Sequence, residues 1–381
     1  MKDDTRNSRR GRPRPRPLKT LMGLGLGLVA LIGTSAASIQ TSGAATARSR
    51  QAAGFPVLKK SQIKIAIVAG GSNAYFTPWT SAANALAKAL GVTVTYVVAP
   101  GATFNVNVEV PAVNALVAKG YNAFVLYPDG AAAIEPEENR LIARGIPVIE
   151  VAACSPSPTP ALACFATNVE ASAEYETQLL IKAIGGKGNI AFLTGLLTDP
   201  NTVLREAGVH QAIAATHGKV KLVETVSNID TPSAAPPAVE SLLASKGSLL
   251  QGMFSTDYYP SVATSAALLS NPSFRHIKFI GQDNDPTVMK AIVQHAIYGT
   301  MYQNSYGQPY MAATWLYKIL ADGCKINPAG FVEAQGVDHF VNSGYFFIGQ
   351  QEISKYVGRP ESIPSQTSQL LANSSKYLSC P

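Results

Sequence analysis

The sequence predicts an α/β protein with two domains of similar size, each a doubly wound parallel sheet that helices cover on both faces. Short runs of apolar and β-branched residues alternate with longer stretches of helical spacing from residue 64 onward. Most of the predicted strands are continuous apolar runs, as expected of strands buried on both faces. The alternation begins again near residue 171. A chain of 381 residues has room for two such domains.

The first array accounts for residues 65–151. Its predicted strands are 65–69, 92–98, 123–127 and 146–151. Its predicted helices are 80–90, 108–119 and 134–144. Gly91 follows the first of these helices at the position where a left-handed residue usually ends a helix.

The second array accounts for residues 171–347. Its predicted helices are 171–184, 203–216, 237–245, 261–269, 286–295 and 309–320. Its predicted strands are 189–194, 221–226, 252–255, 278–281, 299–303 and a last one near 340–347. The segments 48–60 and 358–381, rich in Ser, Pro and Gln, are expected to be tails.

Residues 1–47 have the pattern of a cleavable export signal. A basic run ending at Lys19 precedes an apolar stretch from Leu21 to Ile32, and small residues follow. The stretch is well short of the ~20 residues that span a bilayer. We therefore expect a periplasmic or secreted protein. General secretion is the default route, although Arg9-Arg10 leaves the twin-arginine route open.

The mature protein is nearly neutral. Of the 31 basic and 24 acidic residues, 8 and 2 lie in residues 1–47, which leaves 23 and 22. The Arg10-Gly11-Arg12-Pro13 segment resembles a minor-groove DNA hook, but an apolar run directly behind it favours export instead. No electrostatic argument for a nucleic-acid partner remains.

All four cysteines follow the signal, where an oxidising compartment favours disulfides. Four cysteines allow three pairings. Cys154 and Cys164 flank the Pro-rich loop 155–160, which a short bridge would pin, so we favour Cys154–Cys164 and Cys324–Cys380. A zinc site is the alternative. The cysteines lack the C-x₂-C spacing and the nearby His that are typical of such sites, which argues against it.

The sequence offers no local signature of catalysis. The Gly-rich turn 69–73 lacks the spacing of a nucleotide loop, and neither G-x-S-x-G nor H-E-x-x-H occurs. We predict no cofactor, no metal site and no enzymatic activity. An exported hydrolase on a similar sheet is the competing class.

Polar and aromatic residues recur at the carboxyl ends of the predicted strands. In an open parallel sheet these ends face the ligand crevice. A sugar needs carboxylates and amides for its hydroxyls and aromatic rings for its C–H faces. For each Asp and Asn, turn formation is the alternative explanation. The residues in question are Asn73, Tyr75, Phe76, Tyr127, Asp129, Asp257, Tyr258, Asp283 and Asn284.

Together these segments resemble the ribose- and galactose-type periplasmic binding proteins, the receptors of ABC importers. The resemblance rests on Ile65 to Phe76, Tyr127-Pro128-Asp129, Ile146 to Ile149, Phe279 to Asp283 and Gln303, and covers residues 61–356. It implies a monomer whose two lobes, joined by a three-stranded hinge, close on one small sugar or polyol. An ABC permease of the inner membrane would be the partner.

The resemblance also implies a division of the chain and roles for single residues. The N-lobe would hold 61–166 plus 304–338, the C-lobe 167–303 plus 339–357, and 358–381 would be a tail. Tyr75 and Phe76 match the aromatic residues that stack on the ligand in that family, and Asp257 falls where an Asn or Asp is usual. Asp283 matches the family's C-lobe carboxylate, and Gln303 matches its hinge-side amide. With Asn73 and Tyr127 these are the candidate ligand-binding residues.

The chain departs from that family at three places. Ala152 and Ala153 replace an Asp-Arg or Asp-Ser pair, Tyr127 replaces a frequent Asn, and Val203 aligns with an Arg, with Arg205 two residues further on. These changes predict a pocket that is less charged and more aromatic than a ribose site. A polyol, a modified sugar or a furanone-like autoinducer-2 signal remains open, and with it a role as the receptor of a membrane sensor.

Overall fold

The computed structural model describes residues 54–99, 104–197, 199–356 and 371–381. The expected export signal, residues 1–47, lies outside these ranges. Within them no helix has both the length and the apolar character that crossing a membrane requires. Two six-stranded sheets and a small two-stranded sheet organise the described chain.

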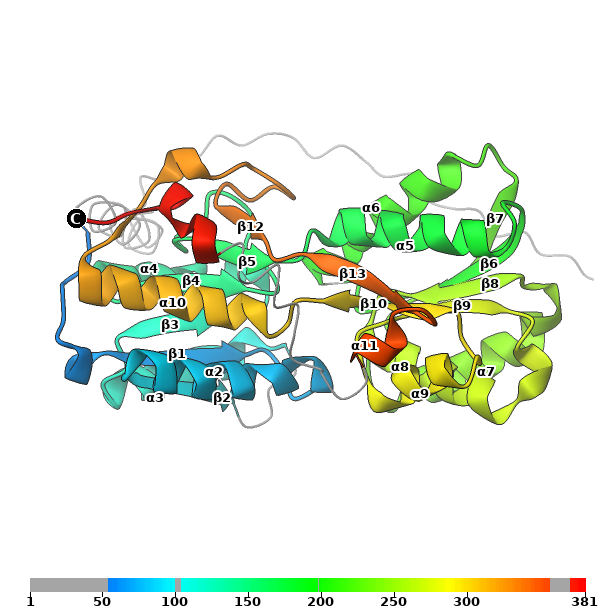
Figure 1. The fold of residues 1–381 in the computed structure, drawn as a ribbon, viewed down its shortest axis with the longest axis horizontal. Helices are drawn as coiled ribbons and strands as arrows, with labels where there is room; N and C mark the ends of the chain where they lie inside the picture. The colour runs from blue at the N-terminus through cyan, green and yellow to red at the C-terminus, as the bar shows by residue number, and fades with distance from the viewer. Residues whose placement is uncertain (1–53, 100–103, 198, 357–370) are drawn as a thin grey trace, which may run out of the picture. The chain divides into compact units, whose positions relative to one another are not determined.

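The first lobe is built on a parallel sheet with the strand order β12-β5-β4-β3-β1-β2 (Figure 1). Its strands are β1 (Lys64–Ala69), β2 (Thr93–Val98), β3 (Ala123–Leu126), β4 (Val148–Val151), β5 (Cys164–Ala166) and β12 (Phe340–Asn342). Its helices are α2 (Thr77–Leu90), α3 (Val106–Ala118), α4 (Glu135–Ala143) and α10 (Gly307–Asp322).

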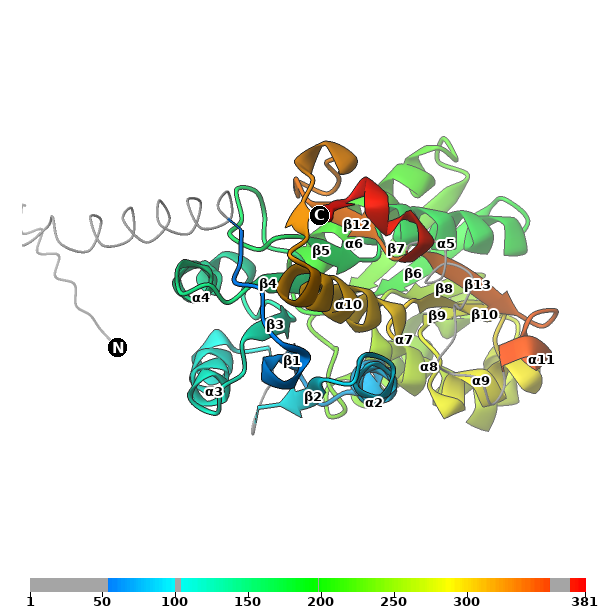
Figure 2. The ribbon, with the colours of Figure 1, turned by 60° about the vertical axis from the view of Figure 1, so that its left-hand side comes forward.

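Alternate residues of β1 supply two different cores. Ile65 and Ile67 pack in one apolar cluster with residues of α2 and α10. Ala66 and Val68 pack in another with residues of α3 and α4. Figure 2 shows these two helix pairs on opposite sides of the sheet. A strand with both faces buried must be apolar throughout, which is the pattern that predicted it.

The second lobe has the strand order β13-β10-β9-β8-β6-β7. Its strands are β6 (Gly188–Leu193), β7 (Val220–Val226), β8 (Gly252–Ser255), β9 (Lys278–Gln282), β10 (Gly299–Gln303) and β13 (Tyr345–Gly349). Its helices are α5 (Val169–Ala183), α6 (Pro200–Ala214), α7 (Ala235–Lys246), α8 (Tyr258–Ser270), α9 (Pro286–Val293) and α11 (Ile353–Tyr356). Only β13 among these strands runs antiparallel to its neighbour. The predicted pair of doubly wound lobes is confirmed.

Short 3-10 helices occur in several connections. They are η1 (Lys60–Gln62), η2 (Ala74–Phe76), η3 (Ala131–Ala133), η4 (Gly247–Leu249), η5 (Pro272–Phe274), η6 (Pro328–Gly330) and η7 (Asn373–Lys376).

Three described connections pass between the lobes: β5 to α5, β10 to α10, and β12 to β13. The third differs from expectation, because the single strand predicted near 340–347 is two strands. β12 pairs with β5 of the first sheet and β13 pairs with β10 of the second. Gly344, with a φ of 89°, lies between them and breaks the strand. The third connection thus follows Asn342, a few residues after the expected boundary at 338/339.

The end of the chain is not a free tail. Residues 371–381 return to the first lobe, where β14 (Leu378–Ser379) pairs with β11 (Lys325–Ile326). Tyr377 packs on Trp315, with 5.3 Å between the ring centroids. Cys380 is bonded to Cys324 directly before β11. Apolar side chains and a disulfide therefore hold a segment whose composition suggested only a tail.

Candidate functional site

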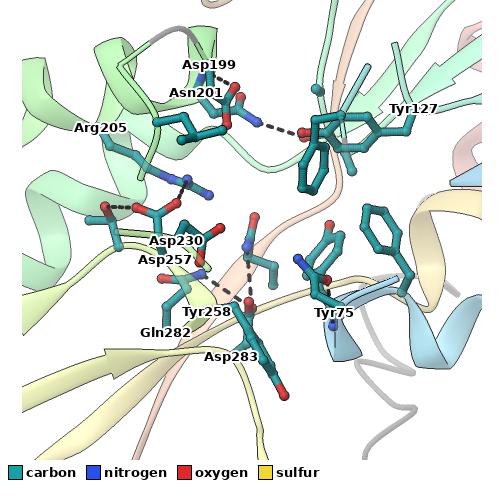
Figure 3. A pocket seen from close by; sticks show the side chains of 18 of the residues that line it. Tyr75, Tyr127, Asp199, Asn201, Arg205, Asp230, Asp257, Tyr258, Gln282 and Asp283 are labelled. Carbon is teal, nitrogen blue, oxygen red and sulfur yellow. Dashed lines mark hydrogen bonds and ion pairs between the residues drawn. The ribbon is translucent and has the colours of Figure 1, made fainter. Parts of the chain in front are cut away.

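A cavity of about 220 Å³ lies between the lobes, at the carboxyl ends of strands from both sheets. Figure 3 shows Tyr75 and Tyr127 on one side of it and Arg205, Asp230 and Asp257 on the other. All seven residues predicted to bind ligand line this cavity: Asn73, Tyr75, Phe76, Tyr127, Asp257, Asp283 and Gln303.

The first lobe contributes an aromatic wall. Asn73 caps η2 by accepting a hydrogen bond from the Tyr75 amide at 3.2 Å, which presents Tyr75 and Phe76 together. The Phe76 ring packs edge-on against Tyr127, with centroids 5.6 Å apart. The Tyr75 hydroxyl donates to Gln308 Oε1 at 2.7 Å and is thereby fixed in place. Burial raises the pKa of Tyr75 far above that of a free phenol, so it stays protonated.

Phe104 joins this wall although the sequence did not single it out. Its ring lies 5.4 Å from that of Tyr127 and 6.2 Å from that of Phe76. It follows β2 by several residues, so the rule that strand ends face the crevice could have found it. Its amide donates to Gly70 O at 2.8 Å, which ties this residue to the turn after β1.

The end of β4 closes the same wall with small, uncharged residues. Ala152, Ala153 and Cys154 line the cavity, and Cys154 is bonded to Cys164 of β5. Both disulfides favoured from the sequence are present. None of the described first-lobe residues that line the cavity carries a formal charge.

The second lobe contributes a charged wall. Arg205 of α6 pairs with Asp257, with 2.9 Å between Nη1 and Oδ1. The other carboxylate oxygen of Asp257 accepts hydrogen bonds from the Gly195 amide at 2.8 Å and the Thr256 hydroxyl at 3.0 Å. Asp257 thus lines the cavity, but the ion pair and the hydrogen bonds of its carboxylate described above are all made with groups of its own lobe.

Asp283 follows β9 with a left-handed backbone, φ 64°, and is 5% exposed. Its Oδ1 accepts long hydrogen bonds from Gln303 Nε2 at 3.4 Å and Gln282 Nε2 at 3.5 Å. Burial raises the pKa of Asp283 to about 7, although Arg205 and the two amides oppose the rise. Such a carboxyl can accept hydrogen bonds from a ligand that enters.

Two more aspartates lie in this wall. Asp230 accepts a hydrogen bond from the Tyr259 amide at 2.9 Å, and burial followed by repulsion from Asp257 raises its pKa to about 7. Asp199 caps α6 by accepting from the Asn201 amide at 2.9 Å, and burial raises its pKa as well. Both follow strands of the second sheet, although the sequence did not single them out.

The aromatic first-lobe wall agrees with the expectation of a pocket more aromatic than a ribose site, and the charged residues of the described lining all come from the second lobe. Val203, the residue that aligned with the family's arginine, is 58% exposed. Helix α6 starts at Pro200, earlier than predicted, and its Arg205 reaches the cavity instead. The described lining contains this arginine and four aspartates.

The Gly-rich turn after β1 is explained by packing. A Cβ on Gly70 would lie 2.4 Å from Asp129 Oδ1 and 2.5 Å from the Tyr127 ring. Asp129 itself is buried beneath the cavity and donates its amide to Glu109 Oε2 at 2.9 Å. Across the described ranges, no group of three or more His, Cys, Asp or Glu residues is arranged to hold a metal ion.

A family model described as a periplasmic binding protein domain matches residues 65–324. The chain belongs to this family. Solved structures of other proteins show the same fold. An ABC transporter solute binding protein from Burkholderia graminis, in complex with D-arabinose, has a TM-score of 0.68 and 20% identity, covering 79% of this chain and 99% of its own. One from Actinobacillus succinogenes with bound D-allose has a TM-score of 0.68 and 20% identity, covering 77% and 100%.

Two curated proteins are similar to this chain in sequence. The xylitol-binding protein of Mycolicibacterium smegmatis is 30% identical over 110 residues, which is 29% of this chain and 31% of that protein. The D-apiose import binding protein of Paraburkholderia graminis is 27% identical over 231 residues, which is 61% of this chain and 72% of that protein. The match to the xylitol-binding protein thus spans under a third of that protein's length.

Proposed function

We propose that this periplasmic binding protein is the exported receptor of an ABC importer and captures a small sugar or sugar-like molecule between its lobes. The observation that carries the proposal is the cavity, where an aromatic wall from one lobe faces carboxylates and amides from the other. Rings cover the C–H faces of a sugar, and carboxylates accept its hydroxyl protons.

The similar proteins support a small ligand. The curated relatives are described as binding xylitol and D-apiose, and the solved structures hold D-arabinose and D-allose. These are molecules of five or six carbons. A cavity of about 220 Å³ suits one such molecule.

Export and transport complete the proposal. Residues 1–47 would direct the chain to the periplasm and be removed there, and the receptor would act as a monomer that delivers its ligand to a permease. The competing classes, an exported hydrolase and a sensor of an autoinducer-2-like signal, have no specific observation in their favour.

The test is a thermal-shift screen of the mature protein, from residue 48, against pentoses, hexoses and pentitols, followed by calorimetry of the hits. A bound ligand stabilises the fold by mass action, about 2.7 kcal/mol at a hundredfold excess over Kd. The ligand recovered after incubation should be chemically unchanged. Absence of any shift across the panel would contradict a sugar receptor, and a converted ligand would favour an enzyme.

The variant Asp283→Ala tests whether this residue belongs to the binding site. Loss of a charge-assisted hydrogen bond in a desolvated cavity should weaken binding by about 2–3 kcal/mol. Asp322→Ala, at the exposed end of α10, removes an aspartate far from the lining and should leave the affinity unchanged. Equal affinities for both variants would remove Asp283 from the site.

A further inference from the structure

The two walls of the cavity differ sharply in charge. Every formally charged side chain among the described lining residues comes from the second lobe. The first lobe supplies the rings of Tyr75, Phe76, Phe104 and Tyr127. A ligand that fills the cavity must therefore present a very different chemical face to each lobe.

The charges of the second wall do not balance. Arg205 is the one cationic side chain among the described lining residues, and Asp257 compensates it directly at 2.9 Å. Asp199, Asp230 and Asp283 remain, and no described ion pair joins any of them to a lysine or arginine. Buried carboxylates need a counter-charge or several hydrogen-bond donors.

Some of the hydrogen-bond donors in this wall are already in use. The side-chain amides of Gln282 and Gln303 already donate to Asp283 Oδ1. The side-chain amide of Asn201 donates to the Ala152 carbonyl at 3.5 Å. Each of these three amides thus has one N–H in use, while the carboxyls of Asp199, Asp230 and Asp283 have no cation of their own among the described ion pairs. A neutral sugar brings both donors and acceptors, whereas an ammonium group brings three donors and no acceptor.

We propose, building on the proposed function, that the ligand carries a protonated primary amine, as an amino sugar or amino polyol does. The ammonium group lies toward Asp230 and Asp283, and supplies the positive charge that these two carboxyls lack. The aromatic wall packs on the C–H face of the ligand, on the side away from the ammonium group. The hydroxyl groups of the ligand form hydrogen bonds with the remaining polar side chains that line the cavity.

The protonation of the unliganded wall agrees with this arrangement. The pKa values of Asp230 and Asp283 are raised to about 7 by burial, with Asp257 adding repulsion and Arg205 opposing the rise at both groups. Gln282 and Gln303 also oppose it at Asp283, and the Tyr259 amide at Asp230. An ammonium nearby would lower both values, because an opposite charge favours the ionised carboxylate.

The experiment uses matched pairs in which a single hydroxyl or amine differs, with calorimetry on the mature protein. The pairs are D-glucose with D-glucosamine, D-galactose with D-galactosamine, and xylitol with 1-amino-1-deoxyxylitol. The amine member of at least one pair should bind about tenfold or more tightly than its hydroxyl partner, since hydrogen bonds to charged groups are the stronger ones. Its N-acetyl derivative, which is uncharged, should lose that advantage.

Two variants locate the effect in the wall. Asp230→Asn and Asp283→Asn keep the Oδ1 acceptors of the Tyr259, Gln282 and Gln303 hydrogen bonds, and asparagine tolerates the left-handed backbone at 283. Each should reduce binding of the amine member more than that of the hydroxyl member. Asp322→Asn, away from the lining, should change neither.

The outcomes separate the two proposals. Hydroxyl members that bind as tightly as their amine partners, or more tightly, overturn the amine ligand and leave the sugar receptor standing. Equal loss of both members in the asparagine variants overturns the assignment of the ammonium to this wall. A protein that binds a neutral sugar of the screen but no amine overturns the amine ligand alone, and one that binds neither these pairs nor any member of the screen contradicts the proposed function as well.

Discussion

Arg205 and Asp257 form a buried ion pair in the wall of the cavity, with 2.9 Å between Nη1 and Oδ1 and side chains that are 11% and 6% exposed. Arg205 comes from α6, and Asp257 directly precedes α8. Because Asp257 also accepts from the Gly195 amide and from the Thr194 and Thr256 hydroxyls, its position is determined by four groups of its own lobe. Arg205 is therefore held at the cavity before any ligand enters.

Replacing Arg205 by methionine should destabilise the unliganded protein by about 3 kcal/mol, because removal of one partner leaves the buried Asp257 without its cation. Urea unfolding without ligand measures this change. Arg205→Met combined with Asp257→Asn should be less destabilised than the sum of the single variants, since the two residues interact directly. Arg144→Met, on an exposed residue that ends α4, is the control. An Arg205→Met protein as stable as the parent would show that the pair contributes no net stability.

The two disulfides should appear in a peptide map of exported protein digested without reduction, as Cys154 linked to Cys164 and Cys324 linked to Cys380. The second closes a loop with a sequence separation of 56 residues. Replacing both of its cysteines by serine should cost about 4 kcal/mol on the loop-entropy model. It should also make residues 371–381 the first site of limited proteolysis. Free thiols in exported material would contradict both bridges.

Much of the fold could be predicted because its signals are local. Strands such as β1 are apolar on both faces, and helices such as α2 end at a left-handed Gly91. The short strand β5 and the split between β12 and β13 escaped prediction, since three-residue strands carry too little pattern. Their pairing is decided by residues distant in sequence.

The site could be predicted in part for a similar reason. Tyr127 and Asp283 follow strands directly and Tyr75 lies in η2, shortly after β1, so the rule for parallel sheets located them. Arg205 lies within a helix, and which of its faces meets the cavity depends on where that helix begins. Asp230 follows β7 at a position that a turn residue would also occupy. Only the packing of the second lobe distinguishes the two explanations.

The stability of the unliganded protein should fall as pH rises from about 5 to 8. Burial raises the pKa of Glu150 from 4.5 to about 7, and it raises that of Glu138 well above 4.5, with repulsion from Glu150 adding to the effect. A carboxyl with a raised pKa holds a proton in the folded state that the unfolded chain has released. Its stabilising contribution is complete below the unfolded pKa and is lost through the folded one.

Unfolding by urea at several pH values measures this slope. Glu138→Gln, which cannot ionise, should reduce it, whereas Glu240→Gln on the exposed side of α7 should not. Glu150 also accepts hydrogen bonds from the backbone and side chain of Ser155, so its ionisation changes the strength of the contacts that hold the start of the loop after Cys154. A stability that is constant over this range would mean that water reaches these carboxyls and restores their ordinary titration.

The last prediction concerns closure, which distinguishes a transport receptor from a passive binder. The aromatic wall and the carboxylate wall belong to different lobes, so a ligand contacts both fully only when they close. A ligand that binds the closed form more tightly shifts the population toward that form. The size of the shift is set by the difference between its affinities for the closed and the open forms. Small-angle scattering should show a smaller radius of gyration once the true ligand is added.

Replacing Asp257 and Asp283 together by asparagine should abolish that compaction. The double variant removes the negative charge that holds Arg205 in place and the carboxylate at the end of β9, while Tyr75 and Phe76 stay intact on the first lobe. Weak binding to the aromatic wall can persist, but it no longer favours the closed form, because the ligand then contacts one lobe only. Asp322→Asn should compact like the parent. Tight binding of the ligand with no compaction in the parent would indicate a cavity already closed, and a permease would then have no change of shape to recognise.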